Sequence, residues 1–128
     1  MQNNVKLLPT EADEQATLFS WATMKSGKYP ELKLLFHIPN GGQRSKSEAA
    51  RFKAEGVKPG VPDIFLPVAR APFHGLFIEL KRQKGGKVSD NQKKWIEDLL
   101  RQGYMTVVAC GWKEASEYIT EYLNAKEW

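Results

Sequence analysis

The run Leu76–Lys81, with the sequence LFIELK, places Leu or Ile at every second position and predicts a β-strand with two unlike faces. Residues two apart in a strand share a face, so the Leu and Ile side chains should pack together on the core. Glu79 and Lys81 then project together from the opposite face. Acids and lysines inside such a run cost stability, and this pair therefore suggests chemistry.

A second short run, Asp63–Leu66, precedes this strand and predicts its antiparallel neighbour in a hairpin with a wide loop. If the two strands pair, the Asp63 carboxylate reaches Glu79, and two carboxylates without a counter-charge repel each other. A divalent cation removes this conflict, because Mg²⁺ prefers carboxylate oxygens and keeps waters that can act as nucleophiles. Lys81 could then orient the water or offset charge. The alternative is a solvated Glu79–Lys81 pair, with Asp63 only ending a turn.

Capping boxes and hydrophobic periodicity predict the remaining elements. Thr10, Ser45 and Ser89 would each cap a helix. The expected segments are helices over Glu11–Lys25, from Ser45 to near Gly56, from Ser89 to Gly103 and over Lys113–Asn124, and strands over Leu32–Ile38 and Met105–Cys110. The first of these strands would place Leu34, Phe36 and Ile38 on one face. The order α-β-α-β-β-α-β-α predicts an α/β fold in which helices flank a mixed sheet.

The length of 128 residues suits one domain, expected over 1–128 with a core from about 11 to 124. No stretch is apolar for long enough to cross a bilayer, and the first residues lack the apolar region of a secretory signal. Cys110, the single cysteine, lies in an apolar run that we expect to be buried on both faces. These features favour a cytoplasmic protein.

Positive charge is concentrated in the middle of the chain. Residues 44–95 carry twelve Lys and Arg against five acids, which gives +7, whereas residues 96–128 carry a net −3. A basic segment of this kind suggests a polyanionic partner, most commonly nucleic acid. A solvated basic face without a partner would explain the charge equally well.

Two short motifs in this segment carry a resemblance to a known family. Pro62-Asp63 followed by Glu79-Leu80-Lys81 resembles the signature of the PD-(D/E)XK nuclease superfamily. The run His37–Gly42, the run Gly56–Asp63 and the pair Ser89 and Gln92 look similar to the VRR-NUC branch, the virus-type replication-repair nucleases. The resemblance spans roughly residues 11–111. The element order resembles the αβββαβ core of the superfamily, with one helix inserted after the first strand.

The resemblance implies a set of site residues. Glu14, Asp63 and Glu79 would hold Mg²⁺ or Mn²⁺, with the backbone carbonyl of Leu80 as an extra ligand. Lys81 would assist the attacking water. Gln92 would help to place it, although completing the capping box with Ser89 also explains that residue. Glu14 shares the face of Leu18 and Trp21 on the first helix; an acid that favours the helix dipole is the alternative.

Glycines and basic residues near the motifs are candidates for contacts with phosphates, which give affinity without a sequence code. Those we single out are Asn40, Gly41, Gly42, Arg44, Lys46, Lys58, Arg82, Lys84 and Lys87. A hairpin turn would also explain the Asn-Gly-Gly run, and a solvated loop the last three. His37 is expected to be a hydrogen-bonded neighbour of this loop rather than a catalytic base.

We therefore expect a metal-dependent DNA endonuclease. The resemblance implies 5′-phosphate products, action on branched or four-way (Holliday) junctions in replication and repair, and a homodimer, as in the stand-alone phage and bacterial members. One alternative is a DNA-binding module of the same fold without activity, whose signature would be a missing acid or lysine. Another is a restriction-type nuclease, although the short chain leaves little room for a separate recognition element.

Overall fold

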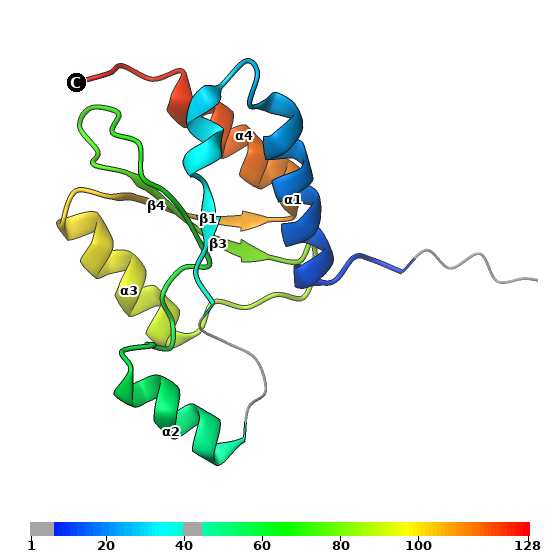
Figure 1. Ribbon diagram of the computed structural model, residues 1–128, viewed down its shortest axis with the longest axis vertical. Coiled ribbons are helices and arrows are strands. Elements are labelled where there is room, and N and C mark those ends of the chain that lie inside the picture. The colour runs from blue at the N-terminus through cyan, green and yellow to red at the C-terminus, as the bar shows by residue number, and fades with distance from the viewer. Residues whose placement is uncertain (1–6, 40–44) are drawn as a thin grey trace, which may run out of the picture.

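A computed structural model describes residues 7–39 and 45–128 (Figure 1). Its elements confirm the predicted order and the mixed α/β class. They are α1 (Glu11–Lys25), the 3₁₀ helix η1 (Pro30–Leu34), β1 (Phe36–His37), α2 (Lys46–Ala54), β2 (Ile64–Leu66), β3 (Leu76–Lys81), α3 (Asp90–Arg101), β4 (Met105–Cys110) and α4 (Trp112–Leu123). None of the helices in these two ranges is both long and apolar enough to cross a membrane.

The four strands form one sheet in the order β1-β2-β3-β4. β2 pairs with β3 in antiparallel register, with Ile64 opposite Ile78, so the predicted hairpin is confirmed. β4 runs parallel to β3, and α3 provides the crossover that a parallel pair requires. The first strand is shorter than predicted and adds only two residues to the edge of β2.

The two faces of the sheet are covered differently. The inner face packs against α1 and α4, which lie side by side in Figure 1, and its side chains are buried. These inner side chains are Ile64, Leu66, Leu76, Ile78, Leu80 and Ala109. The outer face carries half-buried aromatic rings, among them Phe65 and Phe77. The helix that packs on this face is α3, which covers it at β4. The alternation predicted for β3 therefore sorts core from non-core side chains as expected.

Three helices begin as predicted. The hydroxyls of Thr10, Ser45 and Ser89 each accept a hydrogen bond from the backbone N–H three residues on. The acid or amide side chain at that position accepts the backbone N–H of the capping residue in turn. None of the residues of α2 is buried, as is also true of α3, but α3 packs against β4 whereas α2 projects from the end of the molecule (Figure 1). Local capping rather than core packing therefore fixes where this helix begins.

The predicted strand over Leu32–Ile38 is wrong in its first half. Leu32 and Leu35 point into the core with 3% and 7% exposure, whereas Leu34 and Phe36 are 51% and 47% exposed. A spacing of three residues is one turn of a 3₁₀ helix, and Pro30 begins that turn. The prediction depended on alternation that puts Leu34 and Phe36 on one face, but it is Leu32 and Leu35 that are buried in the core.

The expected burial of the last strand is also wrong. β4 lies at the edge of the sheet, and only Thr106 and Ala109 along it are buried. Cys110 is exposed because it ends this edge strand, opposite Lys81. The run of apolar residues reflects partial cover by α3 and α4 rather than burial on both faces.

Candidate active site

Asp63 comes directly before β2 and lies beside Glu79 of β3. The antiparallel register that pairs Ile64 with Ile78 puts the two acids in the next position along the strands. Asp63 Oδ2 accepts the backbone N–H of Leu80 at 2.9 Å, which fixes the carboxylate over the end of β3. The Asp63 carbonyl in turn accepts a hydrogen bond from His37 Nδ1 at 2.9 Å, so His37 bonds the backbone beside β2. The Asn-Gly-Gly loop, of which His37 was predicted to be a neighbour, lies outside the described residues.

Glu79, Lys81 and Gln92 form a hydrogen-bonded set. Lys81 Nζ lies 3.4 Å from Glu79 Oε2 and donates to Gln92 Oε1 at 3.1 Å. Gln92 Nε2 donates to the same Glu79 oxygen at 3.1 Å. Gln92 Oε1 also accepts the Ser89 backbone N–H at 2.8 Å, so the residue caps α3 and contacts both charged groups at once. The predicted capping role of Gln92 is therefore confirmed, and its side-chain amide contacts Glu79 and Lys81.

Burial makes Glu79 an unusual acid. The residue is 2% exposed, and its Oε1 atom is the buried side-chain oxygen or nitrogen in the described ranges that has no hydrogen-bond partner. Desolvation, followed by the nearby charge of Asp63, raises the pKa of Glu79 to about 8, and the Lys81 ammonium partly opposes this. The site therefore contains an acid whose charge is poorly compensated and one buried oxygen without a hydrogen-bond partner.

Glu14 is fully buried on α1 but has a different surrounding. Its Oε1 accepts the Trp112 backbone N–H at 3.0 Å, and its Oε2 accepts Gln83 Nε2 at 2.9 Å. Within residues 7–39 and 45–128, no three His, Cys, Asp or Glu side chains gather closely enough to hold a metal ion. Sequence reasoning did not single out Gln83, because nothing in a polar loop signals a bond to a helix so distant in the chain.

Gly60 fixes the approach to Asp63. Its φ of +91° lies in the region that favours glycine, and a Cβ there would lie 2.9 Å from backbone and side-chain carbons of Asn91 in the first turn of α3. The loop that carries Asp63 therefore packs directly on the helix that carries Gln92.

The predicted phosphate contacts are only partly described. Asn40, Gly41, Gly42 and Arg44 lie outside the described residues. Lys46 is exposed on α2 and Lys58 in the loop before Asp63. The remaining three, Arg82, Lys84 and Lys87, are exposed in the loop between β3 and α3, directly after Lys81.

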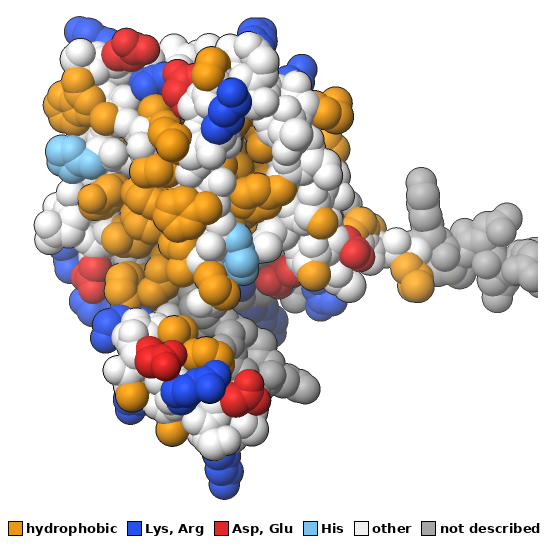
Figure 2. Space-filling model, viewed as in Figure 1, with side chains coloured by type: hydrophobic (Ala, Val, Ile, Leu, Met, Phe, Trp, Pro, Cys, Tyr) orange, Lys and Arg blue, Asp and Glu red, His pale blue; other side chains and the backbone are white. Residues whose placement is uncertain are grey.

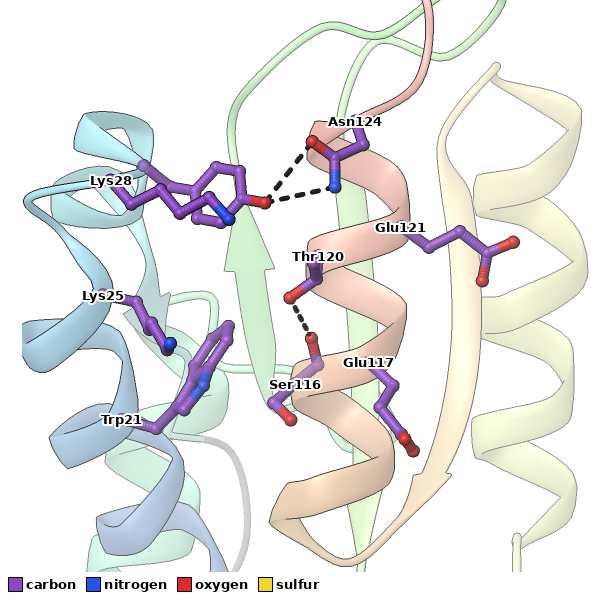
Figure 3. Close-up of a pocket in the computed structure, with 9 residues that line it drawn as sticks. Trp21, Lys25, Lys28, Ser116, Glu117, Thr120, Glu121 and Asn124 are labelled. Atoms are coloured by element: carbon purple, nitrogen blue, oxygen red, sulfur yellow. Dashed lines mark hydrogen bonds between the residues drawn. The ribbon is translucent and has the colours of Figure 1, made fainter.

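A cavity of about 370 Å³ lies elsewhere, between α1 and α4 (Figure 3). Lys25 of α1 and Lys28 of the turn after it line one side of this cavity and residues of α4 line the other, where Asn124 binds the Tyr29 hydroxyl. None of the residues predicted for the site lines it. The cavity is therefore separate from the acid pair.

Comparisons with known proteins agree with the geometry. The VRR-NUC domain family matches residues 10–112. A solved structure described as a VRR_NUC domain protein is 34% identical, superposes with a TM-score of 0.81, and the match covers 96% of this chain and 94% of that one. Curated proteins give no match. Since the family match covers most of the chain and includes Glu14, Asp63, Glu79 and Lys81, the chain belongs to the VRR-NUC family, a family of nuclease type.

Proposed function

We propose that this protein is a metal-dependent deoxyribonuclease that hydrolyses phosphodiester bonds with Mg²⁺ or Mn²⁺, and that residues 1–128 act as one nuclease domain. The observation that carries the proposal is the pair Asp63 and Glu79 beside Lys81, in which the buried Glu79 Oε1 has no partner. An acid pair that repels itself and leaves one oxygen unused is what a divalent cation would stabilise.

The residues fit such a cation. Mg²⁺ is commonly bound through one or two carboxylates together with waters and phosphates, so two acids suffice. The N–H of Leu80 faces Asp63, and the carbonyl of a strand residue faces the same edge as its N–H, so the Leu80 carbonyl is available to the same site. When bound, the metal would supply a water of lowered pKa and polarise a phosphoryl oxygen. Asp63, Glu79 and the Leu80 carbonyl would hold it, with Glu14 as a further candidate.

Lys81 and Gln92 have roles that follow from their contacts. The Lys81 ammonium, held by Gln92 Oε1 and Glu79, can orient the attacking water or offset negative charge on the phosphate in the transition state. Gln92 holds Lys81 and Glu79 in a fixed relation and would place the water through them.

DNA as the substrate is supported by the distribution of exposed basic residues. Arg82, Lys84 and Lys87 follow Lys81 in an exposed loop. α2 carries Lys46, Arg51 and Lys53 and buries none of its residues, so packing on the core does not explain the position of these basic side chains. These groups would bind phosphates of the DNA backbone.

A second copy of the chain is the partner that we propose. Phe36, Phe65, Phe77 and Tyr104 form an aromatic patch on the outer face, in which Phe65 and Phe77 stack at 4.2 Å and Phe36 is 47% exposed. Figure 2 shows hydrophobic side chains gathered over the middle of this face, with charged side chains around its margin. An uncharged face does not repel its own copy, and a two-fold dimer would offer two sites to one branched or four-way junction.

Cleavage assays test the activity. The protein should cleave plasmid and four-way junction DNA in Mg²⁺ or Mn²⁺, should leave 5′-phosphate ends, and should prefer the junction over linear duplex of the same sequence. We also propose the cytoplasmic location, and the role in replication or repair, that the sequence led us to expect. Asp63→Ala should abolish cleavage. Cleavage that persists in this variant would reject the site, and DNA binding without cleavage in any metal would favour a non-catalytic DNA-binding module.

A further inference from the structure

Gln83 has a contact that the proposed reaction does not yet use. It lies two residues after Lys81 in the basic loop, and its side chain leaves that loop to donate from Nε2 to Glu14 Oε2 at 2.9 Å. Its neighbours Arg82 and Lys84 are exposed. Gln83 is also exposed, yet it is bonded to a fully buried carboxylate on α1.

The other oxygen of Glu14 is bound by a helix end. Trp112 is the first residue of α4, and the residue before it, Gly111, has no side chain that could cap the helix. Glu14 Oε1 takes that role by accepting the Trp112 N–H at 3.0 Å. The first N–H groups of a helix lack partners within the helix and carry partial positive charge, so a carboxylate is favourable there.

Gly111 leaves the space in which this arrangement forms. Its φ is +90°, and a Cβ would lie 3.0 Å from Gln83 Cγ and 3.6 and 3.7 Å from the two Glu14 oxygens. The Gly111 N–H also donates to the Lys81 carbonyl at 2.7 Å. The Gln83–Glu14 contact thus lies against Gly111, which is bonded to the backbone of Lys81.

We propose that Gln83 is a positioning residue of the nuclease site, which acts through Glu14. A carboxylate offers about four lone-pair positions, and the bonds from Trp112 and Gln83 occupy one on each oxygen. Gln83 thereby determines which positions of Glu14 stay open to a divalent cation or to its water ligands. This inference rests on the proposed function, since it requires a cation at the site.

Mn²⁺ titration by calorimetry, on the full chain without DNA, tests the proposal without measuring activity. Gln83→Ala and the longer Gln83→Met, which keeps the chain length but removes the donor, should each weaken Mn²⁺ binding about 10-fold, as loss of an outer hydrogen bond to a metal ligand does. On a Glu14→Gln background, Gln83→Ala should cause no further loss, because the two residues act in series. Gln102→Ala, an exposed glutamine at the end of α3, is the matched control.

The possible failures are distinguishable. If Gln83→Ala lowers the melting temperature but binds Mn²⁺ as the wild type does, Gln83 is only structural and the inference is overturned. The same holds if the losses from Glu14→Gln and Gln83→Ala add. If the wild type binds no Mn²⁺, or if Asp63→Ala leaves binding unchanged, the proposed metal site itself fails and the inference fails with it.

Discussion

The two faces of β3 differ in almost every property, although their residues alternate along the same six positions. On the inner face, Ile78 and Leu80 are buried among apolar side chains from α1 and α4. On the outer face, Glu79 and Lys81 are nearly as buried but are surrounded by polar partners. Burial alone therefore does not separate core from site. The distinction is whether each buried polar group has a hydrogen-bond partner, and Glu79 Oε1 has none.

The largest difference between the faces should appear in catalysis. Lys81→Met and Glu79→Gln should each lower the single-turnover cleavage rate by about 10²–10⁴-fold, the range for removal of one catalytic group. Glu79→Gln should change the melting temperature little, because a carboxyl with a pKa of about 8 is mostly protonated at neutral pH. Lys81→Met should lower it, because the acid pair loses its counter-charge, but the variant should remain folded at the assay temperature. Parallel rate and melting measurements check this, and a variant that loses activity only because it unfolds would contradict the division between faces.

Ile78→Ala tests the inner face in the same strand. Removing a fully buried Ile side chain should lower the free energy of unfolding by about 2–5 kcal/mol. The folded fraction should still cleave DNA at close to the normal rate, since the Ile78 side chain lies on the face of β3 opposite to Glu79 and Lys81. Urea denaturation measures the first effect and activity per folded molecule the second. A catalytic loss as large as that of Glu79→Gln would remove the contrast.

The pH dependence of stability sharpens the comparison. Glu79 has a folded pKa of about 8 against a usual 4.5, so between these values the folded state binds more protons than the unfolded state. Stability should therefore fall as pH rises from about 5 to 8, by an amount on the order of a few kcal/mol. Denaturant midpoints in EDTA should show this fall, and Glu79→Gln should flatten it. A profile that stays equally steep in the variant would assign the effect to another group.

Phe36→Glu tests the uncovered half of the outer face. A charge in the aromatic patch should weaken self-association by 10-fold or more, whereas the melting temperature of the monomer should stay close to that of the wild type because Phe36 is half exposed. Light scattering over a dilution series gives the dissociation constant. Glu substituted for Met24, which is exposed on α1, is the control. Equal effects of both changes would argue against this interface.

The smallest effects are expected in the basic loop after β3. Lys84→Ala and Lys87→Ala should each weaken DNA binding a few-fold and lower the slope of log affinity against log salt by about 1, uniformly across DNA sequences. Fluorescence anisotropy at several salt concentrations measures both quantities. Lys126→Ala, near the end of the chain, provides an exposed lysine as control. Sequence-dependent losses would instead indicate contacts with bases.

Local signals in the sequence predicted most of the fold. The capping boxes at Thr10, Ser45 and Ser89 and the alternation in β3 are short-range patterns, and the structure contains all of them. The error at Leu32–Ile38 arose where two periods compete, since leucines spaced by two and by three occur in the same segment. The exposure of Cys110 could not be read locally because it depends on which strand lies at the edge.

The candidate site was predictable to the extent that its members lie on paired strands. Asp63, Glu79 and Lys81 are brought together by the hairpin register, which alternation predicts. The contact between Glu14 and Gln83, and the partial positive charge of α4 at Trp112, require knowledge of how α1 and α4 pack. Packing between distant segments has no short-range pattern, so Gln83 was not singled out.

The close packing of Gly60 on Asn91 has a consequence for mutational tolerance. A methyl group at position 60 would push the first turn of α3 outward, and with it the amide that links Lys81 to Glu79. In a library of random variants screened for loss of cleavage, position 60 should therefore score among the least tolerant, although it contributes no functional group. Its importance would be a matter of clearance between two backbones.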